Sequence, residues 1–563
     1  MARPALLEIA GLTFRYRRAT EPAIRDLSLT VEPGEVLLVA GPSGCGKSTL
    51  IRAINGLIPH SYRGELSGTV RVGGRATVNL RLRDLSRLVG TVLQDPRKQL
   101  VASTVRGELA FGPENLGIAP DEIGRRMEIV MSGGGISHLA PRTTDELSGG
   151  ESQQIAIGGA LMLEPKVLVL DEPLANLDPA AAQRLLGMVR RLADDGVAVV
   201  IVEHRVEDVL EARPDRVLYL DAGSARYLGP LDGFLEIADP ASVKLPFAVA
   251  LSRAKRTGSP SRPASAGLRG THPATEAPPR LEWRDVRAGY DGRTVLHGVS
   301  ARLGAFETVA VLGPNGSGKT TLFKAAIGLV PSSAGQILVD GAPTAGQAVA
   351  DLVATFGYVF QNPSQMLFER SVSDEILFGP RNMRRDPARF DGLVESALRR
   401  VGLLDEPGIR ERPPLTLSFG QQKRLGLAVA LALEPRTLVL DEPSAGQDHR
   451  SATAFMTEVE RIAGLESVYY VTHDADLALT FADRILLLRE GRIVADGPPL
   501  EVIADRDRWT SCNLRFTSLM EANARWGGST GRFMSTEELA QWVASRSAGE
   551  IGGQNTLEER ATQ

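Results

Sequence analysis

Cysteine is nearly absent from this sequence, with two residues, Cys45 and Cys512, among 563. So few cysteines exclude a disulfide framework and favour a reducing compartment. Long apolar runs are also missing: no stretch reaches the roughly 18 consecutive apolar residues of a membrane span. Glu8 interrupts the N-terminal segment where a signal peptide needs an apolar core. We therefore expect a chain that neither spans a membrane nor is secreted.

Charge of one sign is not in excess either. The net charge is −4, which argues against a protein built for bulk nucleic-acid binding, and we expect no nucleic-acid partner. Apolar residues make up 43% and charged residues 23%, values typical of soluble globular proteins. At this length we expect about four domain-sized units, or two large ones.

An internal repeat organises the chain. GPSGCGKST at residues 41–49 returns as GPNGSGKTT at 313–321, and VLVLDEP at 167–173 returns as TLVLDEP at 437–443. The matched features lie at a nearly constant separation of about 270 residues, which indicates a duplicated domain and not a short solenoid repeat.

The repeat also predicts the domain boundaries. We expect one domain at residues 1–250, a flexible linker at 251–280, a second domain at 281–505 and a partly helical C-terminal tail at 506–563. The linker is rich in Pro, Gly, Ser, Thr and Ala, a composition that buries too little apolar surface to offset the entropy cost of ordering. In the tail, Ser535 or Thr536 is a candidate cap for a short helix at 535–546.

Apolar runs alternate with helical patterns in both copies. This alternation predicts an α/β fold with a mostly parallel sheet and helices on its faces. Together with GPSGCGKST and GPNGSGKTT, which each follow a predicted strand, it indicates two tandem P-loop NTPase domains. The predicted strands are 36–40, 167–170 and 197–202 in the first copy, and 308–312, 437–440 and 467–471 in the second; helices are predicted at 180–193 and 452–463.

The pattern G-x-x-x-x-G-K-[ST], present in both copies, predicts a phosphate cradle. Its glycines let backbone N–H groups surround phosphate, and the helix that follows directs its positive end to the same anion. Lys47 and Lys319 are expected to reach the β- and γ-phosphates. The hydroxyls of Ser48 and Thr320 are expected to bind Mg²⁺.

Two acidic pairs follow apolar strands in the matching positions. Asp171 and Asp441 are expected to bind Mg²⁺, because a carboxylate at the end of a buried strand is costly without a cation. Glu172 and Glu442 come next, where a carboxylate can orient or deprotonate the attacking water.

Further motifs give both halves a resemblance to ATP-binding cassette (ABC) nucleotide-binding domains. LSGGE at 147–151 and LSFGQ at 417–421 resemble the signature motif of that family, and LANLD at 174–178 and SAGQD at 444–448 resemble its D-loop. The resemblance implies that Gln94 and Gln361 are Q-loop glutamines, that His204 and His473 are catalytic switch histidines, and that Tyr16 and Tyr290 stack on adenine.

This resemblance implies ATP and Mg²⁺ as cofactors and ATP hydrolysis as the activity. The ATP-binding residues it implies are, in the first copy, Tyr16, Gly41, Ser43, Gly44, Gly46, Lys47, Ser48, Thr49, Gln94, Ser148, Gly149, Gly150 and Asp178, and in the second Tyr290, Gly313, Asn315, Gly316, Gly318, Lys319, Thr320, Thr321, Gln361, Ser418, Gly420, Gln421 and Asp448. The implied magnesium set is Ser48, Gln94 and Asp171, with Thr320, Gln361 and Asp441.

In this family the phosphate loop of one domain shares its ATP with the signature of the other. Such pairing within the chain would match Lys47 with Ser418, and Lys319 with Ser148. The second signature departs from the pattern because Phe419 replaces a glycine. Its side chain either crowds the phosphate or points away from it.

The segments after the Q-loop glutamines point to a subtype. QDPRKQL at 94–100 with TVRGELAFGPENL at 104–116, and QNPSQML at 361–367 with SVSDEILFGPRNM at 371–383, resemble ATPases of energy-coupling-factor importers of vitamins or transition-metal ions. The implied partners are an integral membrane coupling protein and a small substrate-binding membrane protein, with the chain at the cytoplasmic face of the membrane.

Two alternatives remain open. A tandem sugar-importer ATPase often has a degraded second phosphate loop, whereas residues 313–321 are intact. A translation-associated F-type ABC protein usually lacks the switch histidine and has a long, charged, helical linker.

Overall fold

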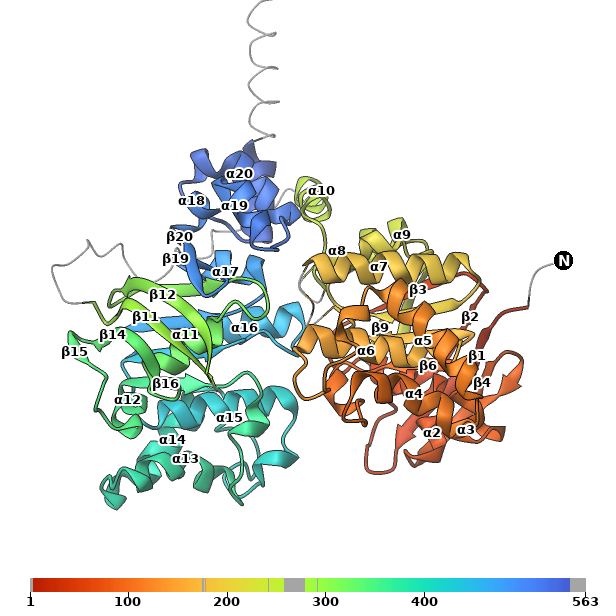
Figure 1. The fold of residues 1–563 in the computed structure, drawn as a ribbon, viewed down its shortest axis with the longest axis horizontal. Helices are drawn as coiled ribbons and strands as arrows, with labels where there is room; N and C mark the ends of the chain where they lie inside the picture. The colour runs from red at the N-terminus through yellow and green to blue at the C-terminus, as the bar shows by residue number, and fades with distance from the viewer. Residues whose placement is uncertain are drawn as a thin grey trace, which may run out of the picture. The chain divides into compact units, whose positions relative to one another are not determined.

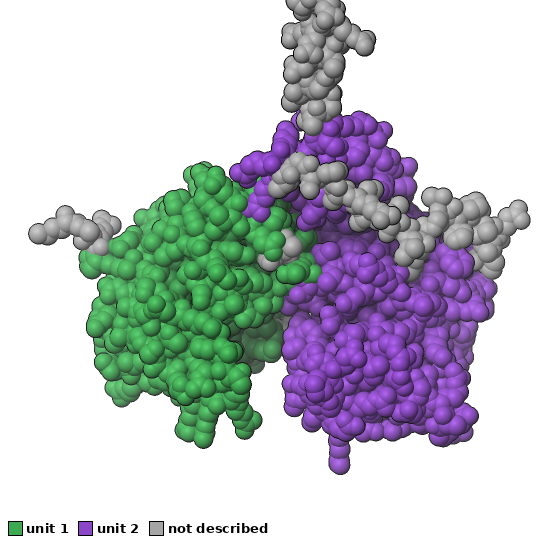
Figure 2. Space-filling view, turned by 180° about the vertical axis from the view of Figure 1, so that it is seen from behind, with its two compact units in different colours: residues 1–249, 448–450 green, residues 250–447, 451–563 purple. Residues whose placement is uncertain are grey.

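The structure is a computed structural model that describes residues 4–174, 177, 179–240, 243–257, 279–290 and 292–546. The chain divides into two compact units, one of residues 1–249 with 448–450 and one of residues 250–447 with 451–563 (Figure 2). Among the described residues, each unit forms one six-stranded and one four-stranded sheet, so the repeat in the sequence is a repeat of the fold.

The six-stranded sheet of the first unit is parallel except for β10, which pairs antiparallel with β9. Its buried central strands consist almost entirely of Val, Leu and Ile, as expected where helices cover both faces of a sheet. In spatial order the strands are β10 (Ser224–Gly229), β9 (Arg216–Asp221), β3 (Val36–Ala40), β8 (Ala198–Val202), β7 (Val167–Asp171) and β6 (Val89–Val92).

A second, antiparallel sheet packs on this one. Its strands are, in spatial order, β2 (Ile24–Val31), β1 (Leu7–Tyr16), β4 (Gly64–Val72) and β5 (Arg75–Ala76). Leu7 and Val31 of this sheet share a core with Val39 and Leu218 of the other. The alternating burial of β1 and β2 shows why: one face of each strand is apolar and turned to the core.

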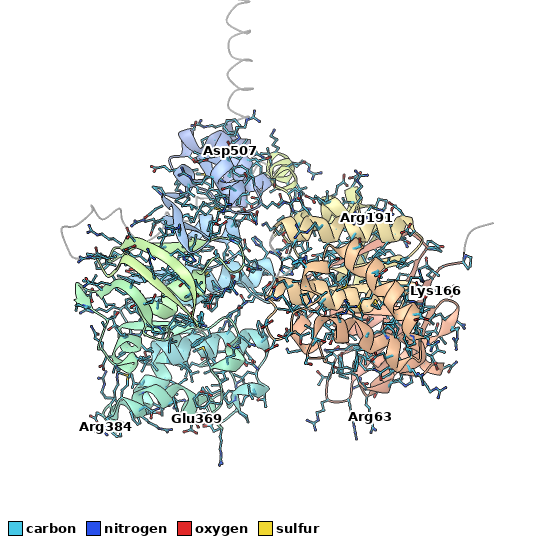
Figure 3. All side chains as sticks on the ribbon, viewed as in Figure 1. Arg63, Lys166, Arg191, Glu369, Arg384 and Asp507 are labelled. Carbon is cyan, nitrogen blue, oxygen red and sulfur yellow. The ribbon has the colours of Figure 1, made fainter. Side chains whose placement is uncertain are left out.

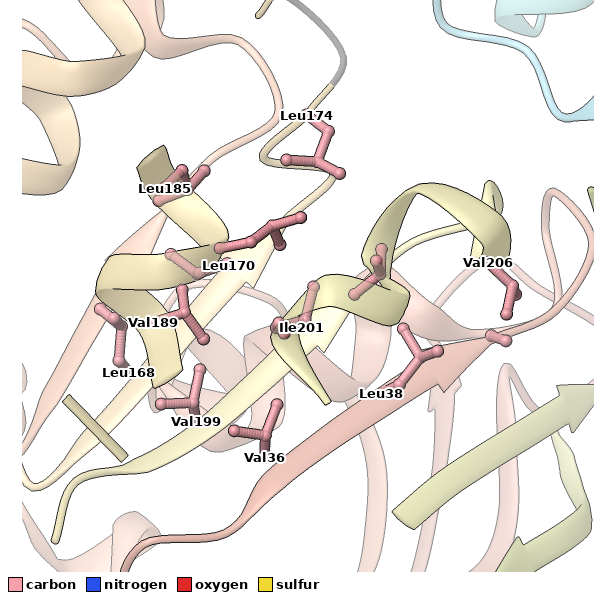
Figure 4. Packing of buried hydrophobic residues seen from close by; sticks show 14 of the residues in the cluster. Val36, Leu38, Leu168, Leu170, Leu174, Leu185, Val189, Val199, Ile201 and Val206 are labelled. Carbon is pink, nitrogen blue, oxygen red and sulfur yellow. The ribbon is translucent and has the colours of Figure 1, made fainter. Parts of the chain in front are cut away.

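Helices cover the remaining faces of the first unit. Leu185 and Val189 of α7 meet side chains of β3, β7 and β8 in a dense apolar core (Figure 4). A separate core lies within the group α4 to α6, where Leu109, Met127 and Ile155 pack together. The helices are α1 (Lys47–Ile54), α2 (Leu57–His60), α3 (Leu82–Leu85), α4 (Val105–Asn115), α5 (Pro120–Gly134), α6 (Gly149–Leu161), α7 (Pro179–Asp194), α8 (Val206–Val209) and α9 (Leu231–Ile237).

The second unit repeats both sheets with the same pairing (Figure 1). Its six-stranded sheet has the order β16 (Phe356–Val359), β17 (Thr437–Asp441), β18 (Ser467–Val471), β13 (Thr308–Leu312), β19 (Arg484–Arg489) and β20 (Arg492–Gly497). Its four-stranded sheet has the order β12 (Arg293–Leu303), β11 (Leu281–Tyr290), β14 (Ser332–Val339) and β15 (Ala342–Pro343). Its helices include α11 (Lys319–Ala326), α12 (Val349–Thr355), α13 (Val372–Asn382), α14 (Phe390–Arg400), α15 (Phe419–Leu431), α16 (His449–Glu460) and α17 (Ala475–Phe481).

The predicted linker begins inside a helix. Helix α10 (Phe247–Thr257) contains residues 251–257, so the prediction of a flexible segment is wrong for that part. The apolar side chains of Phe247 and Ala250 at the start of this helix are buried, and the helix continues from them through residues 251–257. Residues 258–278 lie outside the described residues.

The tail after residue 505 packs as a small helical group against the second unit. It contains α19 (Arg506–Ser511), α20 (Ser518–Thr530) and a helix at 536–546, preceded by α18 (Pro499–Ala504). Trp509 is fully buried, and its Nε1 donates to the carbonyl of Arg515 at 3.0 Å. The Thr517 hydroxyl donates to Asp476 of α17 at 2.6 Å, which attaches the tail to the domain.

Replacing Trp509 with Ala is expected to destabilise the second unit. Loss of a fully buried large aromatic leaves a cavity and costs about 3–5 kcal/mol of the free energy of unfolding. Urea unfolding of the full chain measures this loss. Far-UV circular dichroism is the readout, because it reports backbone structure and does not depend on the tryptophan that is removed. Asp507→Ala is the matched control, because Asp507 is exposed on the same helix (Figure 3); a loss for Trp509→Ala no larger than that of the control would contradict the assignment.

Candidate active site

In each half, the predicted phosphate loop, acidic pair, Q-loop glutamine and switch histidine follow strands of the six-stranded sheet at one edge. In the first unit the phosphate loop follows β3, Asp171 ends β7, His204 comes two residues after β8 and Gln94 two residues after β6. These strands are parallel neighbours, so their carboxyl ends share one edge. Ligands of open α/β sheets bind at such an edge.

The first phosphate loop leads from β3 directly into helix α1. Gly41 has φ of +150°, and a Cβ there would lie 2.2 Å from the carbonyl oxygen of Leu220, so only glycine fits. Lys47 is buried, and its Nζ donates to the carbonyls of Gly41 at 2.7 Å and Pro42 at 2.9 Å. The loop therefore curls around its own ammonium group at the positive end of α1.

The second phosphate loop repeats this geometry. A Cβ at Gly313 would lie 2.0 Å from the carbonyl oxygen of Leu488. Lys319 donates to the carbonyls of Gly313 and Pro314 at 2.9 and 3.0 Å. Burial lowers the pKa of Lys319, although the charges of Glu442 and Asp441 oppose the effect.

The other predicted loop residues take equivalent places in the two halves. Gly46 and Gly318 precede α1 and α11 as their N-caps. Ser43, Gly44, Asn315, Gly316 and Ser48 are exposed, Thr320 is partly buried, and Thr49 and Thr321 are buried.

In the second half, Asp441 is held by two hydroxyl groups. Thr320 Oγ1 donates to its Oδ1 at 3.0 Å, and the Tyr358 hydroxyl donates to its Oδ2 at 3.0 Å. Burial and the charge of Glu442 raise the pKa of Asp441. Thr320 and Asp441, two residues predicted from separate motifs, are therefore brought together.

In the first half, Asp171 shows the same electrostatic pattern. Burial and the adjacent charge of Glu172 raise its pKa to about 7, while Lys47 opposes the shift. Gln94 Nε2 donates to Glu172 Oε2 at 2.6 Å, which places the predicted Q-loop glutamine beside the acidic pair. Gln361, its counterpart, is exposed.

Each predicted base meets the predicted switch histidine of its own half. His473 Nδ1 lies 2.8 Å from Glu442 Oε2, and His204 Nδ1 lies 3.6 Å from Glu172 Oε1. Burial alone raises the pKa of Glu442, but the charge and hydrogen bond of His473 outweigh it and leave the pKa below its usual value. Against the effect of burial, the hydrogen bond and charge of His204 lower the pKa of Glu172 in the same way.

The backbone at both glutamates is left-handed, with φ of +44° at Glu172 and +52° at Glu442. Their N–H groups donate to the carbonyls of Val202 and Val471, the last residues of β8 and β18. Non-glycine residues in this conformation concentrate at functional sites, where the surrounding structure holds them.

The signature serines both cap helices. Ser148 and Ser418 are the N-caps of α6 and α15, and each accepts from the N–H three residues later at 3.3 Å. The side chains of Glu151 and Gln421 accept in return from the serine N–H groups. The replacement of Gln by Glu at 151 thus preserves the capping box.

Four further predicted residues, outside the phosphate loops, acidic pairs and signatures, differ in their placement. Tyr16 is partly buried and its hydroxyl lies 3.1 Å from Thr49 Oγ1, whereas Tyr290 is 46% exposed. Asp448 is buried, and Asp178 lies outside the described residues.

Sequence reasoning missed two buried groups at the acidic pairs. Tyr358 contacts Asp441 from the neighbouring strand, a contact that no local sequence pattern marks. Glu203 is fully buried, accepts from the N–H of His204 at 3.2 Å, and has its pKa raised by burial. A single acid beside a histidine gives no recognisable pattern.

The donor groups at these pairs suit Mg²⁺. They are carboxylate, hydroxyl and amide oxygens, which this ion prefers, and the Thr320–Asp441 contact shows that two of them converge. Asp171, Ser48 and Gln94 in the first half, and Asp441, Thr320 and Gln361 in the second, would hold it, and it would neutralise phosphate charge.

Comparison with known proteins identifies the family. The ABC transporter family model matches residues 24–175 and 296–445, once in each half. The chain belongs to the ABC transporter family. An ABC transporter ATP-binding protein of Methanosarcina acetivorans is 33% identical over 90% of this chain and 88% of its own length, and one of Streptomyces coelicolor is 36% identical over 88% and 95%.

A solved structure is also similar to part of the chain. It is cbiO1 of Clostridium perfringens, described as part of the ABC transporter complex cbiONQ, at 32% identity. The match covers 45% of this chain and 99% of that one, with a TM-score of 0.38.

Membership of the ABC family settles the coarse function. The chain is an ABC transporter ATP-binding protein with two ATPase domains, and it binds and hydrolyses ATP. Within the described part of the chain, every helix is too short or too polar to cross a bilayer.

Proposed function

We propose that this ABC ATPase is the energy-coupling subunit of a membrane importer of the energy-coupling-factor type, which takes up vitamins or transition-metal ions. The observation that carries the proposal is an exposed apolar pair after the Q-loop glutamine of each half. Phe368 and Phe378 are 61% and 42% exposed, and Val101 and Phe111, at the matching places, are 66% and 44% exposed. The resemblance of these segments to energy-coupling-factor ATPases supports the same subtype.

The second pair is built as a fixed surface. The rings of Phe368 and Phe378 meet edge to face with centroids 4.7 Å apart. The carboxylate of Glu375, which is 1% exposed, accepts from the N–H groups of Phe368 and Glu369 at 2.8 Å each. The backbone that presents Phe368 is thus tied to helix α13.

The first half ties its pair down in the same way. Glu108 on α4 accepts from the N–H groups of Val101 and Ala102 at 2.8 and 2.7 Å. An ordered apolar surface that stays exposed in both halves marks a docking site. An amphipathic helix of a membrane subunit suits such a surface, because it presents an apolar face that apolar anchors can cover.

The partners in this proposal are an integral membrane coupling protein and a small substrate-binding membrane protein. The chain would lie peripherally on the cytoplasmic face of the membrane. ATP would join the two halves at two composite sites, each with the phosphate loop of one half and the signature of the other, and hydrolysis would reset them.

Charged substitutions in the apolar pairs test the proposal. Phe368→Asp with Phe378→Asp is expected to lower recovery of the two membrane proteins, one of them small, from detergent-solubilised host membranes by more than roughly tenfold. Central aromatic anchors of an interface typically contribute about 2 kcal/mol or more each. ATPase activity of the isolated chain is the readout for intact folding.

Ile237→Asp is the matched control, because Ile237 is 51% exposed on helix α9 and belongs to neither of these segments. It is expected to retain both partners. If the Phe368→Asp, Phe378→Asp variant recovered the membrane proteins as well as the Ile237→Asp control does, the docking role would be contradicted. Sedimentation of the wild-type chain with ribosomes, and not with membranes, would favour the F-type alternative.

A further inference from the structure

Lys423 is a buried cation in the second half that none of the motifs uses. It lies in the first turns of α15, the helix that begins at the second signature, and is 5% exposed. Its Nζ donates to the carbonyls of Pro443 at 2.7 Å and Ala445 at 2.6 Å. An ammonium group leaves water only when such acceptors replace its hydration. These bonds therefore join the signature helix to the segment that follows Glu442.

Phe419 covers the same junction. The Lys423 Nζ lies 5.6 Å from the centroid of its ring, within the range of a cation–π contact. The ring also rests on Gly446, where a Cβ would lie 2.9 Å from Phe419 Cε1. The Phe419 side chain thus points toward the D-loop of its own half, which explains how the second signature accommodates it.

The segment held by Lys423 carries the proposed base. The N–H of Ala445 donates to the carbonyl of Glu442 at 3.1 Å, which closes a turn directly after this residue. The Ser444 and Thr472 hydroxyls lie 3.3 Å apart, so the turn also meets the residue before His473. Glu442 needs such support because its backbone is left-handed.

The first half has different residues at these places. Gln153 takes the position of Lys423, Gly149 that of Phe419 and Asn176 that of Gly446. In the second half, Phe419 in the signature occurs together with Gly446 in the D-loop. In the first half, Gly149 in the signature occurs together with the larger Asn176 in the D-loop. The junction built from Lys423 and Phe419 is therefore specific to the second half.

We propose that Lys423 is a positioning residue for Glu442: it holds the turn 443–446 against the signature helix, with Phe419 as its cover, and so keeps the Glu442 carboxylate at His473. The inference rests on the proposed role of Glu442 as the base in ATP hydrolysis. Burial lowers the pKa of Lys423 to about 7, and the charge of Glu442 opposes this shift.

The test measures ATP hydrolysis by the full chain in a Glu172→Gln background, where turnover comes from the Glu442 site. Lys423→Gln, the residue of the first half, is expected to lower kcat by roughly tenfold or more with little change in KM, because small displacements of a catalytic group cost up to about 10²-fold. Arg424→Gln is the matched control: it removes the next cation on α15, which pairs with Glu458 and not with the turn.

The same substitution in a Glu442→Gln background is expected to cause no further loss. A loss there, with unchanged kcat in the Glu172→Gln background, would overturn the inference and leave the proposed function intact. Undiminished hydrolysis by the Glu172→Gln, Glu442→Gln double variant would instead overturn the role of Glu442, and the inference with it.

Hydrogen exchange gives a readout that does not depend on turnover. Lys423→Gln is expected to accelerate amide exchange of residues 444–447, with the middle of α15 unchanged. Phe419→Gly, again the residue of the first half, is expected to shift the same amides by a smaller factor. Unaltered exchange at 444–447 in the Lys423 variant would overturn the positioning role.

Discussion

The double variant Glu172→Gln, Glu442→Gln is expected to lose ATP hydrolysis by at least about 10²-fold in kcat, while ATP still binds. General-base catalysis typically contributes about 10²–10⁴-fold, and glutamine has the size of glutamate but cannot take a proton. The phosphate loops with Lys47 and Lys319 are untouched, so affinity is retained. Phosphate release and titration with a fluorescent ATP analogue measure the two properties separately.

The two sites differ in the contact between the glutamate and the histidine. His473 lies 2.8 Å from Glu442, whereas His204 lies 3.6 Å from Glu172, so the glutamate–histidine pair is tighter in the second half. Glu128→Gln, an exposed acid on α5, is the matched control and is expected to hydrolyse ATP normally. Undiminished turnover in the double variant would remove the role assigned to both glutamates.

Removal of the phosphate-loop lysines is expected to weaken ATP binding itself. Lys47→Ala or Lys319→Ala loses a buried cation whose Nζ lies inside the curled loop. A hydrogen bond to a charged group contributes about 1.5–3 kcal/mol, so the affinity of each site is expected to fall by roughly 10- to 100-fold. Isothermal titration of ATP with Mg²⁺ into each variant measures the loss.

Lys166→Ala is the control for these variants, because Lys166 is an exposed lysine outside both loops (Figure 3). It is expected to bind ATP with wild-type affinity. Wild-type affinity in the double lysine variant would show that phosphate is held elsewhere, and the assignment of both loops would then be wrong.

The sequence predicted the central strands closely. The predicted strands at 36–40, 308–312 and 467–471 coincide with β3, β13 and β18. They are short apolar runs between polar segments, and a fully buried parallel strand has this local signature. The phosphate-loop and acidic-pair motifs could be located for the same reason, since each consists of residues that are adjacent in the sequence.

Other parts of the site depend on residues that are far apart in the sequence. Tyr358 meets Asp441 because β16 and β17 pair, and Lys423 meets the turn after Glu442 because α15 packs beside it. Neither side chain belongs to a local pattern. The helical start of the predicted linker was missed likewise, because the residues that bury α10, Phe247 and Ala250, lie just before residues 251–280 and outside the composition on which the prediction was based.

By itself, the sequence determined that two copies of one nucleotide-binding domain stand in tandem, where their phosphate-loop, acidic-pair and signature motifs lie, and that ATP hydrolysis is the activity. These properties are local, because backbone N–H groups, a lysine and neighbouring carboxylates act within a few residues. Only the tertiary structure decided that Phe419 turns to Gly446, that Lys423 is buried against the turn after Glu442, and that Phe368 and Phe378 form one exposed surface. Those contacts come from packing, which joins side chains that the chain order keeps apart.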